Sequence, residues 1–217
     1  MTRDRNTRLR REAWGFAVGS ILFALGAVPF YAQAVGTVVQ NLTFFVGAIF
    51  FTLAAFVQLV LSGRRPPRRG ADRATLADWW AAAVQFVGTL FFNISTTEAL
   101  ITAMNEDARV GSGWRPDAIG SICFLVASAL AVVATTERDR LWDPSARTWR
   151  CSWLNMAGSV FFGASAIGAY VVPETSDLVS LFWANAGTFL GALCFLAAAL
   201  LSRRDIPQDA APTAATI

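Results

Sequence analysis

Apolar residues gather into six long segments along the chain, and shorter polar segments separate them. The apolar segments cover residues 14–32, 38–61, 79–103, 117–134, 153–172 and 178–201. A helix of about 20 apolar residues is long enough to cross the hydrocarbon core of a bilayer. The pattern therefore predicts an all-α integral membrane protein with six transmembrane helices.

A short motif recurs in these segments: a glycine, then a small residue, and a phenylalanine one helical turn after the glycine. It begins at Gly19, Gly47, Gly88, Gly120 and Gly158, and a weaker form, with Gly191 in place of the phenylalanine, begins at Gly187. Successive motif glycines are separated by 28, 41, 32, 38 and 29 residues, so short and long steps alternate. Self-similarity of this kind indicates an internal repeat, and we expect three related helical hairpins.

The hairpins divide the chain into seven parts. These are a basic N-terminus (1–13), hairpin 1 (14–61), a loop rich in Arg and Pro (62–78), hairpin 2 (79–134), a charged loop (135–152), hairpin 3 (153–201) and a tail (202–217). The composition of the tail, rich in Ala, Pro, Asp and Thr, predicts disorder. Arginines before the first apolar segment also fit a cleaved signal peptide ending near Ala34. The motif at Gly19 favours a first transmembrane helix instead.

The distribution of arginine predicts the orientation in the membrane. Every basic residue is an arginine, and 16 of the 18 lie in the two termini and the two long loops. The opposite side carries only Arg109 and Arg115. Because short arginine-rich loops stay in the cytoplasm, we expect both termini inside a bacterial cytoplasmic membrane. The clusters at residues 8–11 and 64–69 either contact anionic headgroups or only set this topology. The bilayer is the expected partner; nucleic acid is not.

The motif glycines are interpreted as helix packing positions. Lipid tails are as apolar as leucine, so helices in a bilayer associate largely through small residues that let their backbones approach. A phenylalanine one turn later can then fill a groove on the facing helix. A pore or substrate groove lined by glycine backbone is the alternative. Three isolated cysteines, Cys123, Cys151 and Cys194, are interpreted as packing residues because no paired spacing exists.

Four polar residues within or beside the apolar segments are candidates for a functional site. Glu98, Asp117 and Asn185 lie toward the predicted outer half of the bundle and Asn93 lies nearer its middle, and together they could surround a water-filled vestibule that opens outward. Each also has a simpler interpretation. Asn93 can make an interhelical hydrogen bond, and Glu98 can lie at the outer interface, where a carboxylate costs little. The sequence leaves these alternatives open.

The composition excludes several chemistries. The chain contains no Lys and no His, so it cannot form a lysine Schiff base, a Walker-type phosphate loop or a histidine proton relay. No nucleophile–base pair or metal-ligand spacing is visible. We expect no enzyme activity, no catalytic residues, no metal and no cofactor.

One segment supports a resemblance to a known family. Residues 114–128, WRPDAIGSICFLVAS, together with the Gly-Ser pairs at Gly19 and Gly158, resemble the YrhK-like bacterial membrane proteins. The likeness extends loosely over residues 14–201. It implies a membrane-embedded hairpin module and supplies no catalytic residues, since the molecular function of that family is uncharacterised. A structural or interaction role is the first expectation; a small-solute transporter or channel with an outward-facing polar vestibule is the alternative.

Overall fold

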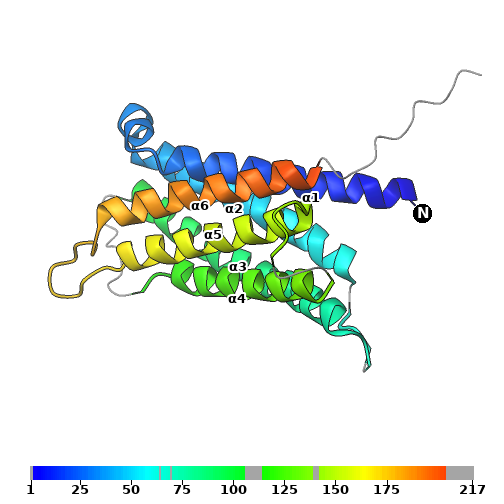
Figure 1. The fold of residues 1–217 in the computed structure, drawn as a ribbon. Coiled ribbons are helices and arrows are strands. Elements are labelled where there is room, and N and C mark those ends of the chain that lie inside the picture. The colour runs from blue at the N-terminus through cyan, green and yellow to red at the C-terminus, as the bar shows by residue number, and fades with distance from the viewer. Residues whose placement is uncertain (1, 64, 69, 106–113, 139–141, 204–217) are drawn as a thin grey trace, which may run out of the picture.

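A computed structural model describes residues 2–63, 65–68, 70–105, 114–138 and 142–203 (Figure 1). They form six helices: α1 (Thr2–Gly26), α2 (Pro29–Ser62), α3 (Arg73–Met104), α4 (Pro116–Arg138), α5 (Arg147–Gly168) and α6 (Leu181–Arg203). Among these residues the one β-type pairing outside the helices is an isolated bridge between Val171 and Leu178. The predicted all-α class with six helices is confirmed.

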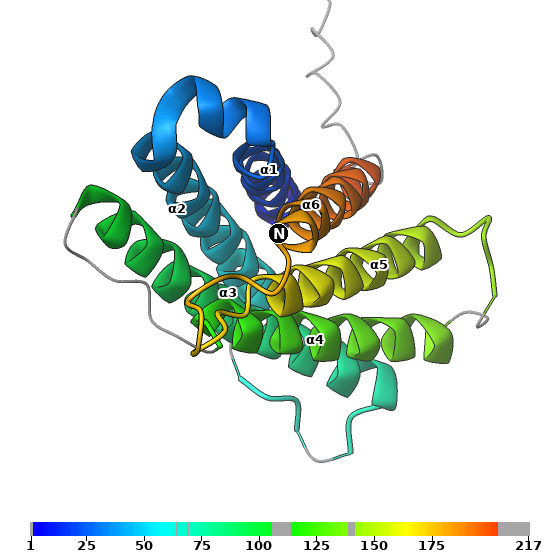
Figure 2. The same cartoon turned by 90° about the vertical axis from the view of Figure 1, so that its left-hand side faces the viewer.

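The six helices form a closed ring. Each helix packs against the next one in the sequence, and α6 packs against α1 (Figure 2). Figure 1 shows α6 running alongside α1, although the two lie at opposite ends of the chain. We call the end of the ring at which α1, α3 and α5 end and α2, α4 and α6 begin the hairpin end.

Four helices are long and apolar enough to cross a membrane: α2, α3, α6 and residues Pro116–Glu137 of α4. They make the chain a multi-pass membrane protein. The other two helices, α1 and α5, begin with charged turns, such as the one that contains Arg147 and Arg150. These turns shorten the apolar part of each helix.

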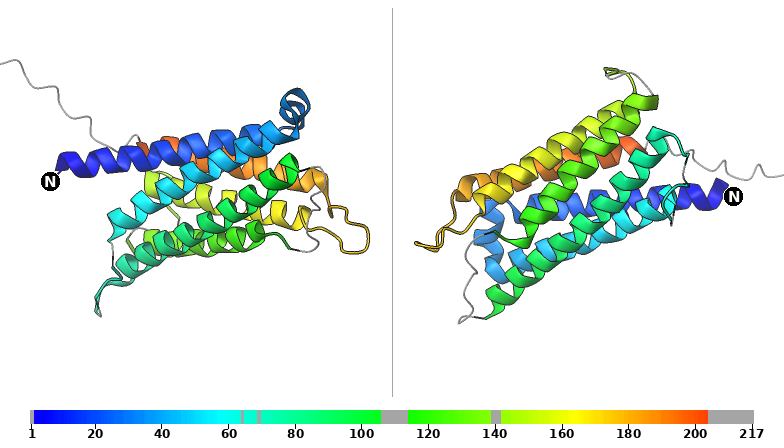
Figure 3. Two further views of the ribbon diagram at one scale, coloured as in Figure 1. Left: turned by 180° about the vertical axis from the view of Figure 1, so that it is seen from behind. Right: turned by 90° about the horizontal axis from the view of Figure 1, so that it is seen from below.

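The first two helices meet at a sharper break than the sequence predicted. We expected the first apolar segment to continue to Ala32, but α1 ends at Gly26 and α2 begins at Pro29. A proline disfavours helical geometry in the residue before it, and Val28 is accordingly extended, with φ −80° and ψ 117°. Gly36 interrupts α2 with φ 81°, and in Figure 3 the first turns of α2 stand at an angle to the rest.

Within each hairpin, a motif glycine of one helix faces the backbone of a motif glycine on the other. A Cβ atom added at Gly88 would lie 3.1 Å from the carbonyl oxygen of Gly120, and one added at Gly120 would lie 3.0 Å from that of Gly88. The phenylalanine after each glycine covers the partner glycine, so Phe124 packs on Gly88 and Phe92 packs on Gly120. The pairs Gly19 with Gly47 and Gly158 with Gly191 have the same arrangement.

The motif in α6 differs from the prediction by one helical turn. Gly191, rather than Gly187, faces Gly158, and Phe195 is the phenylalanine that covers Gly158. Gly187 also lies at the contact between α5 and α6, where backbone atoms of α5 surround it. The small residue after Gly191 is alanine, as it is after Gly47.

Six motif phenylalanines meet at the centre of the ring and form its core: Phe23, Phe51, Phe92, Phe124, Phe162 and Phe195. Those of α1, α3 and α5 form one triangle, with ring centroids 5.7 to 6.2 Å apart. Those of α2, α4 and α6 form a second triangle, with centroids 5.5 to 6.3 Å apart. Five of these six pairs meet edge to face, an arrangement that aromatic rings prefer, and the pair Phe23–Phe162 is tilted. The first triangle lies nearer the hairpin end.

Candidate functional site

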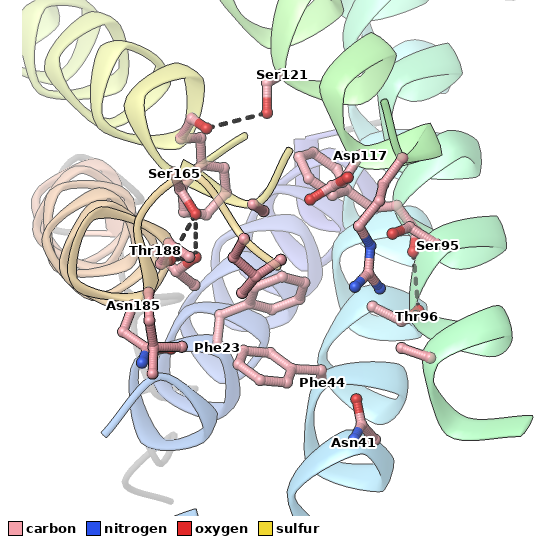
Figure 4. A pocket seen from close by; sticks show the side chains of 18 residues that line it. Phe23, Asn41, Phe44, Ser95, Thr96, Asp117, Ser121, Ser165, Asn185 and Thr188 are labelled. Atoms are coloured by element: carbon pink, nitrogen blue, oxygen red, sulfur yellow. Dashed lines mark hydrogen bonds between the residues drawn. The ribbon is translucent and has the colours of Figure 1, made fainter. Parts of the chain in front are cut away.

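A cavity of about 210 Å³ lies at the hairpin end, above the first triangle of phenylalanines (Figure 4). Phe23, Phe92 and Phe162 line its base. Side chains from all six helices and from the loop before α6 form its walls. Its polar lining residues are Asn41, Ser95, Thr96, Arg115, Asp117, Ser121, Ser165, Asn185 and Thr188.

Three equivalent places in the motif contribute to the walls. The residue three before the motif glycine is Phe44 in α2, Asp117 in α4 and Thr188 in α6, and all three line the cavity. Ser95 in α3 and Ser165 in α5 each follow a motif glycine by seven residues. The cavity therefore lies on the central axis of the ring, where corresponding turns of the three hairpins converge.

Asp117 lies in the first turn of α4, which begins at Pro116. Its Oδ1 atom is buried and has no hydrogen-bond donor among the described residues. A carboxylate near a helix N-terminus is favoured by the helix dipole, and Arg115 brings a positive charge to the same cavity. A buried polar atom without a partner is costly, so Asp117 offers an acceptor that a bound molecule or water could use.

The opposite wall is built from α5 and α6. The Ser165 hydroxyl donates to the Ala184 carbonyl oxygen over 2.6 Å and lies 2.7 Å from the Thr188 hydroxyl. Thr188 donates to the same carbonyl oxygen over 2.9 Å. Asn185 lies beside this pair (Figure 4), and its amide makes no hydrogen bond within the described part of the chain. The two hydroxyls are therefore held by the helices, whereas the Asn185 amide is available to a ligand.

Asn41 occupies in α2 the place that Asn185 occupies in α6, six residues before the motif glycine. Its amide donates to the Thr37 carbonyl oxygen over 2.9 Å, within its own helix. Both asparagines line the cavity. Two amides therefore contribute to the wall from equivalent places in different hairpins.

The structure separates the four residues predicted for the vestibule. Asp117 and Asn185 line the cavity, whereas Asn93 and Glu98 do not. The Asn93 amide donates to the Thr52 hydroxyl of α2 and, over 2.9 Å, to the Thr89 carbonyl oxygen. Asn93 thus makes the interhelical hydrogen bond that was its simpler interpretation. Glu98 is exposed on the surface of α3.

Sequence reasoning missed several residues of this site. Ser121, Ser165 and Thr188 were read only as members of packing motifs or of apolar segments. The signal that could have found Ser165 and Thr188 is their offset from the motif glycines, which Ser165 shares with Ser95 and Thr188 shares with Asp117. Because the sequence analysis assigned the α6 motif to Gly187 instead of Gly191, one helical turn too early, the offsets in α6 did not match those in the other helices.

The site contains no cluster that could hold a metal ion: the described residues include no group of three His, Cys, Asp or Glu side chains suited to one. The free cysteines Cys123, Cys151 and Cys194 are all partly buried, and none lines the cavity. Hydrogen-bonding groups, together with one positive and one negative side chain, are what the cavity offers. It is suited to binding a small polar molecule.

The fold and its hydropathy define an all-α, multi-pass membrane protein with a cavity of mixed polar and apolar lining at one end. Comparison with family models, curated proteins and solved structures found no match to this chain. The resemblance to the YrhK-like proteins therefore stays a prediction that rests on the hairpin motif.

Proposed function

We propose that the protein spans a bacterial cytoplasmic membrane six times, with both termini inside, and that its cavity binds a small polar solute from the outer side. The observation that carries the binding proposal is the buried Oδ1 atom of Asp117, which lacks a donor. The Asn185 amide faces the same cavity. Burying a polar atom without a partner is unfavourable, and a ligand that donates to the Asp117 Oδ1 atom would relieve that cost.

Six spans are supported by the way α1 and α5 join the ring. Each contributes a motif phenylalanine, Phe23 or Phe162, to the same buried core as the four apolar helices. Helices that share one core with membrane-spanning helices are expected to lie in the same bilayer. The matching contacts of motif glycines in the three hairpins support an internal repeat of related hairpins, of the kind found in the YrhK-like proteins.

The proposed orientation in the membrane is based on the distribution of the arginines. Apart from Arg115, the arginines among the described residues belong to helix ends, or to the loop before α3, at the end of the ring opposite the hairpin end. Reporter proteins fused after residues 70, 145 and 210 are expected to be cytoplasmic. A reporter that scores outside the cytoplasm at any of these points would contradict the orientation. The headgroup role of the basic clusters rests partly on Arg64 and Arg69, which lie outside the described residues.

The solute site can be tested by thermal unfolding of the purified protein with small amines, amino acids, amides and polyols. A ligand at a concentration of about 100 times its Kd adds roughly 2.7 kcal/mol to the free energy of unfolding. Any solute that stabilises the wild type should lose this effect in Asp117→Asn and in Ala99→Phe, which fills the cavity. It should keep the effect in Glu98→Gln, because Glu98 lies outside the cavity. A solute effect that survives the first two changes would contradict the site.

A structural or interaction role is the second candidate. It is favoured by the phenylalanine core, which closes the base of the cavity and joins all six helices. Transport through the ring would require these rings to separate. If no solute stabilises the wild type and Asp117→Leu increases the free energy of unfolding, the cavity is only a packing defect and this second role holds.

A further inference from the structure

A second void lies beside the cavity and is almost entirely apolar. This groove has a volume of about 450 Å³ and runs between the α1–α2 turn and the start of α6. Its lining residues are Ala27, Val28, Pro29, Leu181, Phe182, Asn185, Ala186 and Phe189. Phe182 is 70% exposed and Leu181 is 64% exposed, although both are large apolar side chains. In a bilayer, such a groove faces lipid chains.

The break between α1 and α2 forms one wall of the groove. Because α1 ends at Gly26, its last carbonyl groups lack helical partners. The Gln40 side chain donates to the Gly26 carbonyl oxygen over 2.8 Å and satisfies one of them. The wall formed by Ala27, Val28 and Pro29 can therefore remain apolar without exposing that backbone oxygen to lipid.

The groove and the cavity share two residues. Leu181 and Asn185 line both voids, so the cavity with its polar and charged groups and the apolar groove lie on either side of these side chains. A molecule with a polar head and an apolar chain would match this pairing: its head would lie in the cavity and its chain along the groove. A solute without a chain would leave the groove unused.

The charges in the cavity restrict which head group a ligand can carry. Asp117 presents a buried oxygen that needs a donor, and Arg115 presents a cation to the same space. A zwitterion satisfies both, with an ammonium N–H donated to Asp117 and an anionic group accepting from Arg115. A quaternary ammonium has the same charge but no N–H to donate.

We propose that the ligand of this site is a zwitterionic amphiphile with an ammonium head, such as a phosphoethanolamine lipid, whose chain occupies the groove at the α1–α6 contact. The proposal rests on the solute site proposed above, and it adds the chemical class of the ligand. It also gives the ligand a route from the lipid layer, since the groove lies on the outer surface of the ring.

The test is equilibrium binding to the full chain in phosphatidylcholine nanodiscs, with empty nanodiscs subtracted. Three probes separate head from chain: lysophosphatidylethanolamine, the same molecule with a choline head, and phosphoethanolamine without a chain. The ethanolamine lysolipid should bind at least about tenfold more tightly than either of the others. Burying two methylene groups, or losing one hydrogen bond to a charged group, already changes affinity by about this factor.

Two matched variants test where the acyl chain of the ligand binds. Ala186→Phe fills the groove and should weaken binding of the ethanolamine lysolipid about tenfold or more while leaving phosphoethanolamine binding unchanged. Ala197→Phe adds the same bulk elsewhere on α6, outside both voids, and should leave both unchanged. Asp117→Asn should reduce the preference for the ethanolamine head over the choline head.

The outcomes distinguish the two proposals. If phosphoethanolamine binds as tightly as its lysolipid, the groove assignment is wrong and the solute site stands. If the ethanolamine and choline lysolipids bind equally tightly, the proposal that the site selects an ammonium head with N–H donors is wrong. If the ethanolamine lysolipid binds equally tightly to the wild type and to Ala186→Phe, its acyl chain does not bind in the groove. If none of the three probes binds, the lipid class is wrong, and the screen of small solutes then decides the solute site separately.

Discussion

The ring of Phe92 lies 5.2 Å from that of Phe124, measured between centroids, and the two meet edge to face. The corresponding pairs in the other hairpins, Phe23 with Phe51 and Phe162 with Phe195, are both 5.3 Å apart. Three separate stretches of sequence thus produce the same contact. The reason is local: a glycine on each helix lets the backbones approach, and the phenylalanine one turn later then reaches the partner glycine.

This contact predicts a high cost for removing one ring. Phe124 is 1% exposed and meets Phe51, Phe92, Phe162 and Phe195. Replacing it with alanine should lower the free energy of unfolding by about 3–5 kcal/mol, because a cavity would remain among rings from four other helices. The measurement is a denaturant titration in mixed micelles.

The control for this change is Phe182→Ala. Phe182 is 70% exposed, so its removal leaves no internal cavity. Its free energy of unfolding should stay within about 0.5 kcal/mol of the wild type. Equal effects of the two substitutions would show that the central rings do not hold the helices together.

Gly187 of α6 faces the α5 backbone and Gly163 of α5 faces a side chain of α4, so the two glycines should respond differently to alanine. A Cβ atom at Gly187 would lie 2.6 Å from the Phe161 carbonyl oxygen and 2.7 Å from the Ser165 amide nitrogen. Backbone atoms cannot move aside as a flexible side chain can, so Gly187→Ala should cost about 1–3 kcal/mol. At Gly163 the nearest atom is a Leu125 methyl group at 3.4 Å.

Gly163→Ala is therefore the matched control. Alanine has the higher helix propensity, by up to about 1 kcal/mol, so this variant should be neutral or slightly more stable than the wild type. Thermal unfolding of the two variants side by side measures the difference. A Gly187→Ala protein as stable as Gly163→Ala would contradict the close approach of α5 and α6.

Much of this architecture could be predicted from the sequence, because hydropathy and motif spacing are local signals. The helix count, the all-α class and the pairing of neighbours followed from them. The break at Pro29 was missed because the apolar pattern runs through it without interruption. The α6 motif was misplaced because two glycines, Gly187 and Gly191, compete for one role, and only packing against Gly158 separates them.

The site was less predictable, because it depends on which way each helix faces. Asp117 and Asn185 were grouped by their depth in the bundle, and both line the cavity. Depth alone also selected Asn93 and Glu98, which point to α2 and to the exterior. The missing information was the rotation of α3 about its axis, which the tertiary contacts set.

The Asn93 hydrogen bond to Thr52 should be measurable as a coupling between α2 and α3. In a double-mutant cycle of Asn93→Ala and Thr52→Val, the coupling energy should be about 0.6 kcal/mol, with an upper limit near 1.7 kcal/mol, as found for polar pairs in membranes. Neither single variant should change the binding of a cavity ligand. A coupling energy of zero, or a loss of ligand binding in Asn93→Ala, would contradict the purely structural role of Asn93 and make it a candidate for the binding site again.

The last prediction concerns Glu12, which precedes the apolar part of α1. Burial raises the pKa of its carboxyl group from the ordinary value of 4.5 to about 8. The helices packed against α1 do little to offset this: α2 carries no charged residue, and α6 carries Arg203, whose guanidinium lies 4.1 Å from the centre of the Trp14 ring. On α1 itself, Arg8 and Arg11 lie within one turn of Glu12.

The direction of the pH dependence follows from this shift. Between pH 4.5 and pH 8 the folded protein retains a proton that the unfolded chain releases. The free energy of unfolding should therefore fall as the pH rises through this window, by a few kcal/mol at most since the side chain is only partly buried, and be lowest above it. Glu12→Gln should remove this slope and exceed the wild type in stability at about pH 9, while matching it at about pH 4.

Unfolding midpoints across this pH range provide the measurement, with Glu137→Gln as the control. The Glu137 side chain is 41% exposed and pairs with Arg73 at 3.9 Å on the surface, so its replacement should leave the slope of the wild type in place. If Glu12→Gln and the wild type lose stability in parallel as the pH rises, the carboxyl group of Glu12 is hydrated and ionised in the folded protein. The first turns of α1 would then be open to water rather than packed against α2 and α6.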